Sequence, residues 1–163
     1  MKIYVASSWR NLLQPAIVMA LRRCGHDVYD FRHPAPEVKG FSWSDIDPSW
    51  ETWTAEQYRD ALQHPIAKQG YQYDIDALRG CDACVLVLPS GRSASWEFGY
   101  AMSRGSSGYV VMLDKCEPEL MYHEAHIITS MDELFDVFAS PATSGPRSGE
   151  SEALVSDGGC GHK

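Results

Sequence analysis

Residues 82–100, DACVLVLPSGRSASWEFGY, contain the pattern that decides the fold. An apolar run from Ala83 to Leu88 stops at Pro89, a loop of small polar residues follows, and Glu97 then falls on the first turn of an expected helix. A strand that leads through a Gly/Ser loop into a helix is how α/β sheets present a ligand site. A helix N-terminus favours the charged form of a nearby carboxylate, which is the form that a nucleophile needs. This stretch therefore predicts a ligand crevice with an ionised Glu97.

Composition and charge limit the classes of protein to which the chain can belong. It has 163 residues, of which 44% are apolar and 22% charged, as expected for a single soluble domain. The net charge of −8 argues against a nucleic-acid-binding surface, and no apolar run is long enough to span a bilayer. The N-terminus is typical of a strand rather than a signal peptide, and five cysteines without framework spacing suit a reducing compartment. We expect a cytoplasmic protein with no nucleic-acid and no membrane partner.

Strands alternate with helices along the first 139 residues. Strands are expected at 2–6, 27–31, 83–88, 109–113 and 125–128, and helices at 14–24, 54–63, 66–79, 94–104 and 131–138. This alternation implies a parallel sheet that is covered on both faces, and right-handed crossovers leave few topologies. We predict one α/β domain over residues 1–139, with a five-stranded parallel sheet in flavodoxin-like (Rossmann-like) order. Residues 32–53 form a loop long enough to be functional.

Residues 140–163 differ in composition from the rest of the chain. They are rich in Ser, Gly and Pro, and residues 153–155 are their only apolar cluster. Ordering each residue costs about 1–2 kcal/mol of backbone entropy, which three small apolar side chains at about 1–3 kcal/mol each cannot offset. We predict a disordered tail unless a partner holds it.

Glu97 is the first candidate for chemistry, and it has a simpler alternative interpretation. A carboxylate near the start of a helix can merely stabilise the helix dipole, by about 0.3–1 kcal/mol. Two observations favour a functional role. Trp96, Phe98 and Tyr100 make the surroundings partly apolar, and the small residues of the preceding loop allow a ligand to approach the backbone closely.

Three further candidates lie outside this stretch. Asp74 could face either side of its helix, whereas Asp76 fits a solvated face. Tyr4 alternates with core positions of the first strand, so it is either a site residue or a rim residue that covers the sheet. Trp9 follows the first strand, at the same end of a parallel sheet as Glu97, and could either join the core or stack on a planar ring.

Residues 41–53, FSWSDIDPSWETW, contain three of the five Trp residues. Aromatic side chains interleaved with acidic ones, such as Trp43 and Asp45, suit the wall of a pocket for a planar, donor-rich ligand. An aromatic cluster packed under a long loop explains the same pattern equally well.

Three motifs that suggest metal, redox or nucleotide chemistry do not fit their usual contexts. Cys81 and Cys84 enter a strand, whereas redox pairs lie at a helix N-terminus, so Cys84 is interpreted as a core residue. His123 and His126 are three residues apart, not four as in the zinc helix motif. The loop 90–95 lacks both the P-loop ending and the dinucleotide fingerprint. We expect no metal and no cofactor.

The chain resembles the nucleoside 2-deoxyribosyltransferase family, which includes 2′-deoxynucleoside 5′-phosphate N-hydrolases and related nucleotide N-glycosidases. Residues 3–9, IYVASSW, resemble the family's first strand, and Asp74 stands eight residues before Asp82, as an Asp of the family does ahead of the third strand. EFGYA at 97–101 resembles the family's E-[LF]-G-[YW]-A motif. ELM at 119–121 resembles a segment that a neighbouring subunit lends to the active site.

The resemblance, which covers roughly residues 2–138, implies a role for each matched residue. Glu97 would attack the anomeric carbon and form a glycosyl–enzyme ester, while Asp74 would hold or protonate the leaving base. Tyr4 would position Glu97, and Trp9 would stack on the base. Glycosyl transfer passes through an oxocarbenium-like transition state that an ionised carboxylate stabilises and traps, and a second carboxyl with a raised pKa can protonate the leaving base.

The loop before the expected nucleophile departs from the family's patterns. The transferases carry an Asp six residues before the nucleophile, where this chain has Gly91, whereas the nucleotide hydrolases bind a 5′-phosphate with Ser and Gly in this loop. The expected substrate contacts in addition to Trp9 and Trp43 are Ser7, Asp45, Ser90, Gly91, Arg92 and Ser93, with Glu119 and Met121 from a neighbouring subunit. Arg92 would donate charge-assisted hydrogen bonds to a phosphate, but a Glu119 carboxylate would repel it by about 1–4 kcal/mol.

Residues and resemblance together predict an enzyme that cleaves the N-glycosidic bond of a nucleoside or deoxynucleoside through a Glu97 glycosyl–enzyme intermediate. The sugar would pass to another free base or to water. Two alternatives remain: an N-glycosidase that hydrolyses nucleoside 5′-monophosphates, and a catalytically silent nucleotide-binding module, suggested by the missing Asp at Gly91. Sharing of residues 119–121 between subunits predicts a homodimer or a larger homo-oligomer.

Overall fold

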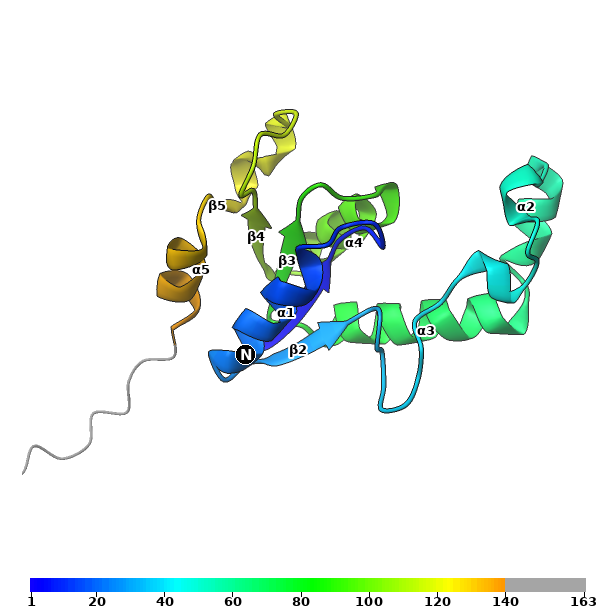
Figure 1. The fold of residues 1–163 in the computed structure, drawn as a ribbon, viewed down its shortest axis with the longest axis horizontal. Coiled ribbons are helices and arrows are strands. Elements are labelled where there is room, and N and C mark those ends of the chain that lie inside the picture. Colours follow the sequence, from blue (N-terminus) through cyan, green and yellow to red (C-terminus); the bar gives the residue numbers. More distant parts are fainter. Residues whose placement is uncertain (140–163) are drawn as a thin grey trace, which may run out of the picture.

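Five parallel strands form one sheet in the order β2-β1-β3-β4-β5 in the computed structural model, which describes residues 1–139 (Figure 1). The strands are β1 (Lys2–Ala6), β2 (Asp27–Asp30), β3 (Ala83–Val87), β4 (Ser107–Val111) and β5 (His126–Ile128). The α-helices are α1 (Gln14–Arg23), α2 (Ala55–Ala61), α3 (Pro65–Gly80), α4 (Arg92–Ser103) and α5 (Met131–Phe138). Short 3-10 helices are η1 (Trp43–Asp45), η2 (Trp50–Thr52) and η3 (Leu120–Glu124). The predicted flavodoxin-like order is confirmed.

The sheet divides the core into two layers, because successive side chains of a strand point to opposite faces. On one face Ile3 and Val5 of β1 pack in a cluster with buried residues of α1 and α5. On the other face Tyr4 and Ala6 pack with buried residues of α3 and α4. All five residues of the central strand β3 are buried, as its continuous apolar run requires in a sheet covered on both sides. Tyr4 therefore lies under α3 and α4, the helices that carry Asp74 and Glu97.

Several element boundaries differ by one or two residues from those expected, among them the starts of β4 and α4. Strand β4 starts at Ser107 rather than at residue 109, because Ser107 and Gly108 pair with Ala83 and Cys84 of β3. A Cβ on Gly108 would lie 2.6 Å from the sulfur of Met102, so a glycine that suggests a loop instead permits close packing of α4 on the strand.

Helix α4 starts at Arg92 rather than at residue 94, with Gly91 in an extended conformation as its N-cap. The backbone N–H of Ser95 donates to the Gly91 carbonyl oxygen over 3.3 Å. Glu97 is consequently on the second turn of the helix, whereas the sequence predicted the first turn.

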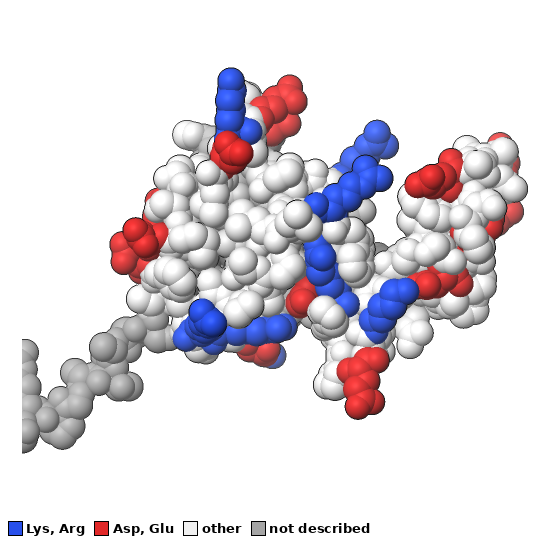
Figure 2. Space-filling view, in the orientation of Figure 1, with Lys and Arg blue, Asp and Glu red and all other residues white. Residues whose placement is uncertain are grey.

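The loop after β2, together with α2 and the start of α3, extends from one side of the sheet as a separate lobe (Figure 1). Helix α2 begins with a capping box in which Thr54 and Gln57 satisfy each other's backbone N–H groups. Figure 2 shows that the surface is hollowed between this lobe and the main body. Within residues 1–139, no helix has both the length and the apolar character needed to cross a membrane. The predicted disordered tail, residues 140–163, lies outside the described residues.

Candidate active site

Glu97 is partly buried on α4, and its environment raises the pKa of its carboxyl to about 7. Burial is the main cause, and the nearby negative charge of Asp74 adds to it. The nearby Tyr4 hydroxyl has the opposite effect and lowers the Glu97 pKa. Within residues 1–139, however, this hydroxyl has no partner at the distance and angle of a hydrogen bond. The expectation of a carboxylate held ionised by the helix N-terminus is therefore wrong, because the effect of the dipole fades after the first turn and burial outweighs it.

Asp74 lies on α3 and faces the sheet, which decides between the two sides that the sequence leaves open. Its Oδ1 accepts a hydrogen bond of 2.7 Å from the hydroxyl of Tyr29. Burial raises the pKa of Asp74 to about 6, and the hydrogen bond from Tyr29 limits the rise. Asp76 on the same helix is exposed, as expected, and its Oδ2 accepts from the side-chain amide of Gln72 over 2.7 Å.

Tyr4 is fully buried in β1, so the interpretation as a rim residue is wrong. Its ring stacks on that of Tyr29, with centroids 5.1 Å apart and planes 19° from parallel. Burial raises the pKa of its hydroxyl well above the usual value, and the negative charges of Glu97 and Asp74 add to this effect. A buried hydroxyl without a partner in the described part of the chain is costly.

Tyr29 is the site residue that sequence reasoning missed. The position of Tyr29 follows from the parallel register. Tyr4 of β1 lies opposite Tyr29 of β2, so both rings point to the same face of the sheet. The available signal was the alternation in DVYD, residues 27–30, where Val28 and Asp30 are buried and Tyr29 takes the opposite face.

Side chains from the loops after β1 and β2 connect the carboxyl ends of the three strands beside the site. The Ser7 hydroxyl donates to the Val87 carbonyl oxygen over 2.9 Å. The buried Asn11 amide donates to the carbonyl oxygens of Val87 and Pro89 over 3.2 and 3.1 Å. Arg32 Nη2 in turn donates to the carbonyl oxygen of Asn11 over 2.9 Å. These bonds fix the backbone where β3 ends and the loop that leads into α4 begins.

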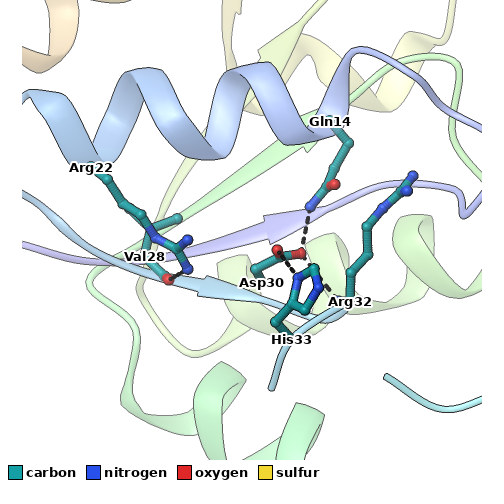
Figure 3. Close-up of polar contacts among 6 residues, drawn as sticks. All are labelled: Gln14, Arg22, Val28, Asp30, Arg32 and His33. Atoms are coloured by element: carbon teal, nitrogen blue, oxygen red, sulfur yellow. Dashed lines mark hydrogen bonds and ion pairs between the residues drawn. The ribbon is translucent and has the colours of Figure 1, made fainter. Parts of the chain in front are cut away.

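Asp30 at the end of β2 anchors this arrangement (Figure 3). Its Oδ1 accepts from Gln14 Nε2 at 2.9 Å and from the backbone N–H of Arg32 at 3.1 Å, while its Oδ2 lies 3.1 Å from His33 Nδ1. Burial acts to raise the pKa of Asp30, but these hydrogen bonds outweigh burial and lower it. The ionised carboxylate thus holds the start of the loop 32–53 against the sheet. Figure 3 also shows Arg22, whose Nη2 donates to the carbonyl oxygen of Val28 over 3.0 Å.

Trp9 lies at the carboxyl end of β1 and is 48% exposed, so it is not a core residue. The edge of its ring meets Phe31 with centroids 5.2 Å apart, and the Arg32 guanidinium stands 5.3 Å from the ring centroid. Its backbone carbonyl oxygen accepts from Arg32 Nη2 over 2.9 Å. The side chain is therefore held in place while leaving surface free, which stacking on a ligand requires.

Trp43 packs in an aromatic cluster at the lobe, as the structural alternative for residues 41–53 proposed. Its ring lies edge-on to Phe41, Trp53 and Tyr58, at centroid distances of 4.7, 5.6 and 5.6 Å. Asp45 forms an exposed ion pair of 3.3 Å with Lys39. Among residues 1–139, no hydrogen bond, ion pair or ring contact joins Trp43 or Asp45 to Glu97. Their role in a pocket wall stays a prediction.

The other predicted substrate contacts lie in two exposed segments. Ser90 and Gly91 are half-buried and Arg92 and Ser93 are exposed, and the α4 N-terminus has no side-chain cap and no acidic residue in its first turn. The free N–H groups there suit an anion or an oxygen-rich ligand. In the segment 119–121, Glu119 is exposed, and Leu120 and Met121 are 86% and 77% exposed.

Open hollows and clusters of metal ligands do not coincide with the carboxylates. Two hollows of about 620 and 280 Å³ lie beside the loop 33–39 and along β2, and neither is lined by Asp74 or Glu97. Among residues 1–139, no three His, Cys, Asp or Glu side chains gather as a metal site requires. Cys84 is fully buried on β3, as expected for a core residue. Among the carboxyls of residues 1–139 whose pKa values are shifted, Asp74 and Glu97 are the two that are raised.

The chain is similar in structure to proteins that act on nucleosides, although no protein-family model and no curated protein matches its sequence. A 2-deoxyribosyltransferase from Bacillus psychrosaccharolyticus superposes with a TM-score of 0.54 and 18% identity, over 88% of this chain and 95% of the other. The two chains share one fold. A CMP N-glycosidase from Clostridium botulinum matches with a TM-score of 0.49 and 14% identity, over 82% of this chain and 93% of the other. The first match confirms the α/β architecture that the resemblance implies.

Proposed function

We propose that the protein is a nucleoside 2-deoxyribosyltransferase-like enzyme that cleaves the N-glycosidic bond of a nucleoside or deoxynucleoside. The observation that carries the proposal is the pair Asp74 and Glu97, two partly buried carboxyls with raised pKa values on neighbouring helices. Two carboxyls, one acting as the nucleophile and the other as the acid, are the usual equipment for breaking a glycosidic bond. The fold shared with a 2-deoxyribosyltransferase supports the same reaction class.

In the first step Glu97, in its ionised form, attacks the anomeric carbon of the sugar. The bond from that carbon to the base nitrogen breaks, its electron pair stays on the base, and Asp74 gives its proton to the base. The sugar is then held as an ester of Glu97. In the second step a nitrogen of another base, or a water oxygen, attacks the same carbon, Glu97 leaves as a carboxylate, and Asp74 takes up the released proton.

A hydrolase for nucleoside 5′-monophosphates is the second candidate, and the start of α4 favours it. The helix lacks a side-chain cap and a first-turn acid, and Arg92 and Ser93 begin it. Free backbone N–H groups and a guanidinium suit a 5′-phosphate. The exposed Glu119 counts against it if a neighbouring subunit brings that carboxylate to the same place. A binding module without turnover is the third reading.

Chromatography of reaction mixtures tests the reaction class. The protein is incubated with a panel of deoxynucleosides, with and without a 5′-phosphate, and with a second free base. A new nucleoside shows transfer, and free sugar or sugar phosphate shows hydrolysis. The absence of both products across the panel would overturn the enzymatic proposals and leave the binding module.

Two variants connect the activity to the site. Glu97→Gln should lose the covalent intermediate by mass spectrometry and at least about 10³-fold of the rate, since the nucleophile is gone. It should still bind the substrate. Asp76→Asn is the matched control, because Asp76 is an exposed carboxylate on the helix that carries Asp74, and it should keep the wild-type rate.

We further propose that the active form is a homodimer or larger, with residues 119–121 placed at the substrate of the neighbouring subunit. The high exposure of Leu120 and Met121 supports this, since apolar side chains in an exposed turn gain from burial against a partner. Light scattering at micromolar concentration should give at least a dimer. A monomer that is fully active would contradict the shared site.

A further inference from the structure

Tyr29 contacts both the carboxyl of Asp74, which in the proposed function protonates the base, and the ring of Tyr4. Its hydroxyl lies 2.7 Å from Asp74 Oδ1, and its ring stacks on Tyr4 at 5.1 Å. The two tyrosines lie opposite each other on adjacent strands. A ring held on one side by the sheet and by a neighbouring ring has little freedom, so the hydroxyl oxygen has a fixed position.

The charges around Tyr29 decide which atom donates in this hydrogen bond. Asp74 on α3, Glu97 on α4 and Asp30 on β2 are the acidic groups that act on it, and no cation is among them in the described residues. Burial and these negative charges hold the pKa of the Tyr29 hydroxyl far above its usual value. The phenol therefore stays protonated throughout the working range, and its O–H donates to Asp74 Oδ1.

We propose that Tyr29 is a positioning residue that occupies Oδ1 of Asp74, so that the proton delivered to the leaving base is carried by Oδ2. A protonated carboxyl has one O–H, and a strong donor on one oxygen leaves the other oxygen as its place. This inference rests on the proposed function, in which Asp74 protonates the base. It adds a residue that acts on the acid, while Tyr4 acts on the nucleophile.

A purely structural role makes different predictions from this positioning role. If Tyr29 only fills space against Tyr4, its ring matters and its hydroxyl does not. Tyr29→Phe keeps the ring and the stacking and removes the hydroxyl alone. Tyr109→Phe is the matched control, since Tyr109 lies on β4, separated from β2 by β1 and β3, and packs on the opposite face of the sheet.

The decisive experiment compares two substrates that differ in whether the base needs a proton. An ordinary purine deoxynucleoside requires protonation of its leaving base, whereas the 7-methylated purine analogue already carries a positive charge and leaves without it. Tyr29→Phe should lower kcat about tenfold on the ordinary substrate, within the range for a general acid that is misplaced, and by less than about twofold on the 7-methylated one. Tyr109→Phe should leave both rates unchanged. An equal loss on both substrates, or no loss, overturns the proposal.

A second measurement keeps the inference testable if no substrate is turned over. The Asp74 carboxyl is followed by carbon NMR during a pH titration, with Asp74→Asn used to assign its signal. The bond from Tyr29 limits the rise of the Asp74 pKa, so its loss in Tyr29→Phe should move the titration to higher pH. An unchanged titration overturns the role of Tyr29 whatever the reaction is. A shifted titration without activity would instead contradict the proposed function alone.

Discussion

At the scale of single residues, the unusual property of the site is that both carboxyls bind protons too tightly to be fully ionised near neutrality. The pKa is about 7 for Glu97 and about 6 for Asp74, with burial as the first cause for each. The reaction needs Glu97 ionised and Asp74 protonated, which is the less populated arrangement of the free pair. A substrate corrects this, because the positive charge that develops at the anomeric carbon favours the ionised form of the nearby Glu97.

The pH dependence of kcat/KM follows from these two pKa values. Activity should rise as Glu97 loses its proton and fall as Asp74 loses its own, so we expect a bell with its maximum between about pH 6 and pH 7. The two limbs belong to the coupled pair and not to either residue alone. Initial rates at low substrate concentration, from pH 5 to pH 8.5, test this. A rate that stays level over that range would contradict it.

Removing the Tyr4 hydroxyl should separate its effect on Glu97 from its effect on stability. The hydroxyl lowers the Glu97 pKa, so in Tyr4→Phe the alkaline limb of the bell, which the higher of the two pKa values sets, should move to higher pH and the maximum should be lower. The free energy of unfolding in urea should change little, since the hydroxyl is buried without a partner among residues 1–139. A loss of more than about 2 kcal/mol would show that it has a partner in solution.

The sequence identifies Tyr4, Asp74 and Glu97 as candidates because their spacing resembles that of a known family. It also predicts correctly that Asp76 lies on the solvated face of its helix. It does not identify Tyr29, because the role of Tyr29 depends on the pairing of β1 with β2. This pairing places Tyr29 opposite Tyr4, which lies 25 residues away in the sequence. The raised pKa of Glu97 could not be predicted from the sequence either. It depends on burial under neighbouring elements and on the distance to Asp74, which local sequence does not contain.

At the scale of elements, glycine and serine near a boundary are the main cause of error. The loop ending in Gly91 and the pair Ser107-Gly108 both suggest irregular structure, yet α4 begins directly after the first and β4 contains the second. For β4 the neighbouring strand β3 decides, because it pairs with Ser107 and Gly108, and Gly108 lets Met102 of α4 pack closely on the strand. The shift by two residues matters for chemistry, since it moves Glu97 away from the helix terminus.

Gly40 shows how tightly the loop after β2 is held against the loop after β1. A Cβ at this position would collide with the backbone oxygen of Phe31 and would lie 2.8 Å from the Trp9 ring. Gly40→Ala should therefore lower the free energy of unfolding by about 1–3 kcal/mol and displace Trp9. Gly80→Ala is the matched control, because a Cβ there meets nothing within 4 Å, and should stabilise the protein by up to about 1 kcal/mol.

Urea unfolding of both glycine variants, followed by Trp fluorescence, measures these changes. If Trp9 stacks on the base, Gly40→Ala should also raise KM more than it lowers kcat. Equal stabilities of the Gly40→Ala and Gly80→Ala proteins would contradict the close packing of the two loops.

At the scale of the whole molecule, the architecture could be predicted and the placement of the lobe could not. Alternating strands and helices specify the parallel sheet, and right-handed connections specify its order. The loop 32–53 shows no hydrophobic period from which its structure could be predicted. Its position depends on the Asp30 carboxylate at one end and the aromatic cluster around Trp43 at the other. The hollow between lobe and body is a result of that placement (Figure 2).

The raised carboxyl pKa values also predict how the stability of the whole domain depends on pH. A carboxyl with a higher pKa in the folded protein than in the unfolded chain binds more protons when folded, so stability is lost as pH rises from the unfolded to the folded value. For Glu97 that window runs from about 4.5 to about 7. The carboxyls with lowered pKa values, Asp30, Asp47 and Glu133, act below this window. The melting temperature of the wild-type protein should therefore decrease as the pH rises from 5 to 7.5.

Glu97→Gln should remove much of this fall, because a neutral amide has no proton to lose. A full shift of the Glu97 pKa corresponds to about 3 kcal/mol, and partial exposure reduces it to about 1–3 kcal/mol at pH 7.5. The variant should thus melt several degrees higher than the wild-type protein at pH 7.5 and at nearly the same temperature at pH 4.5. Asp76→Asn should follow the wild-type curve. A Glu97→Gln protein that is less stable than wild type at pH 7.5 would mean that a buried partner stabilises the ionised carboxylate, and it would contradict the raised pKa of Glu97.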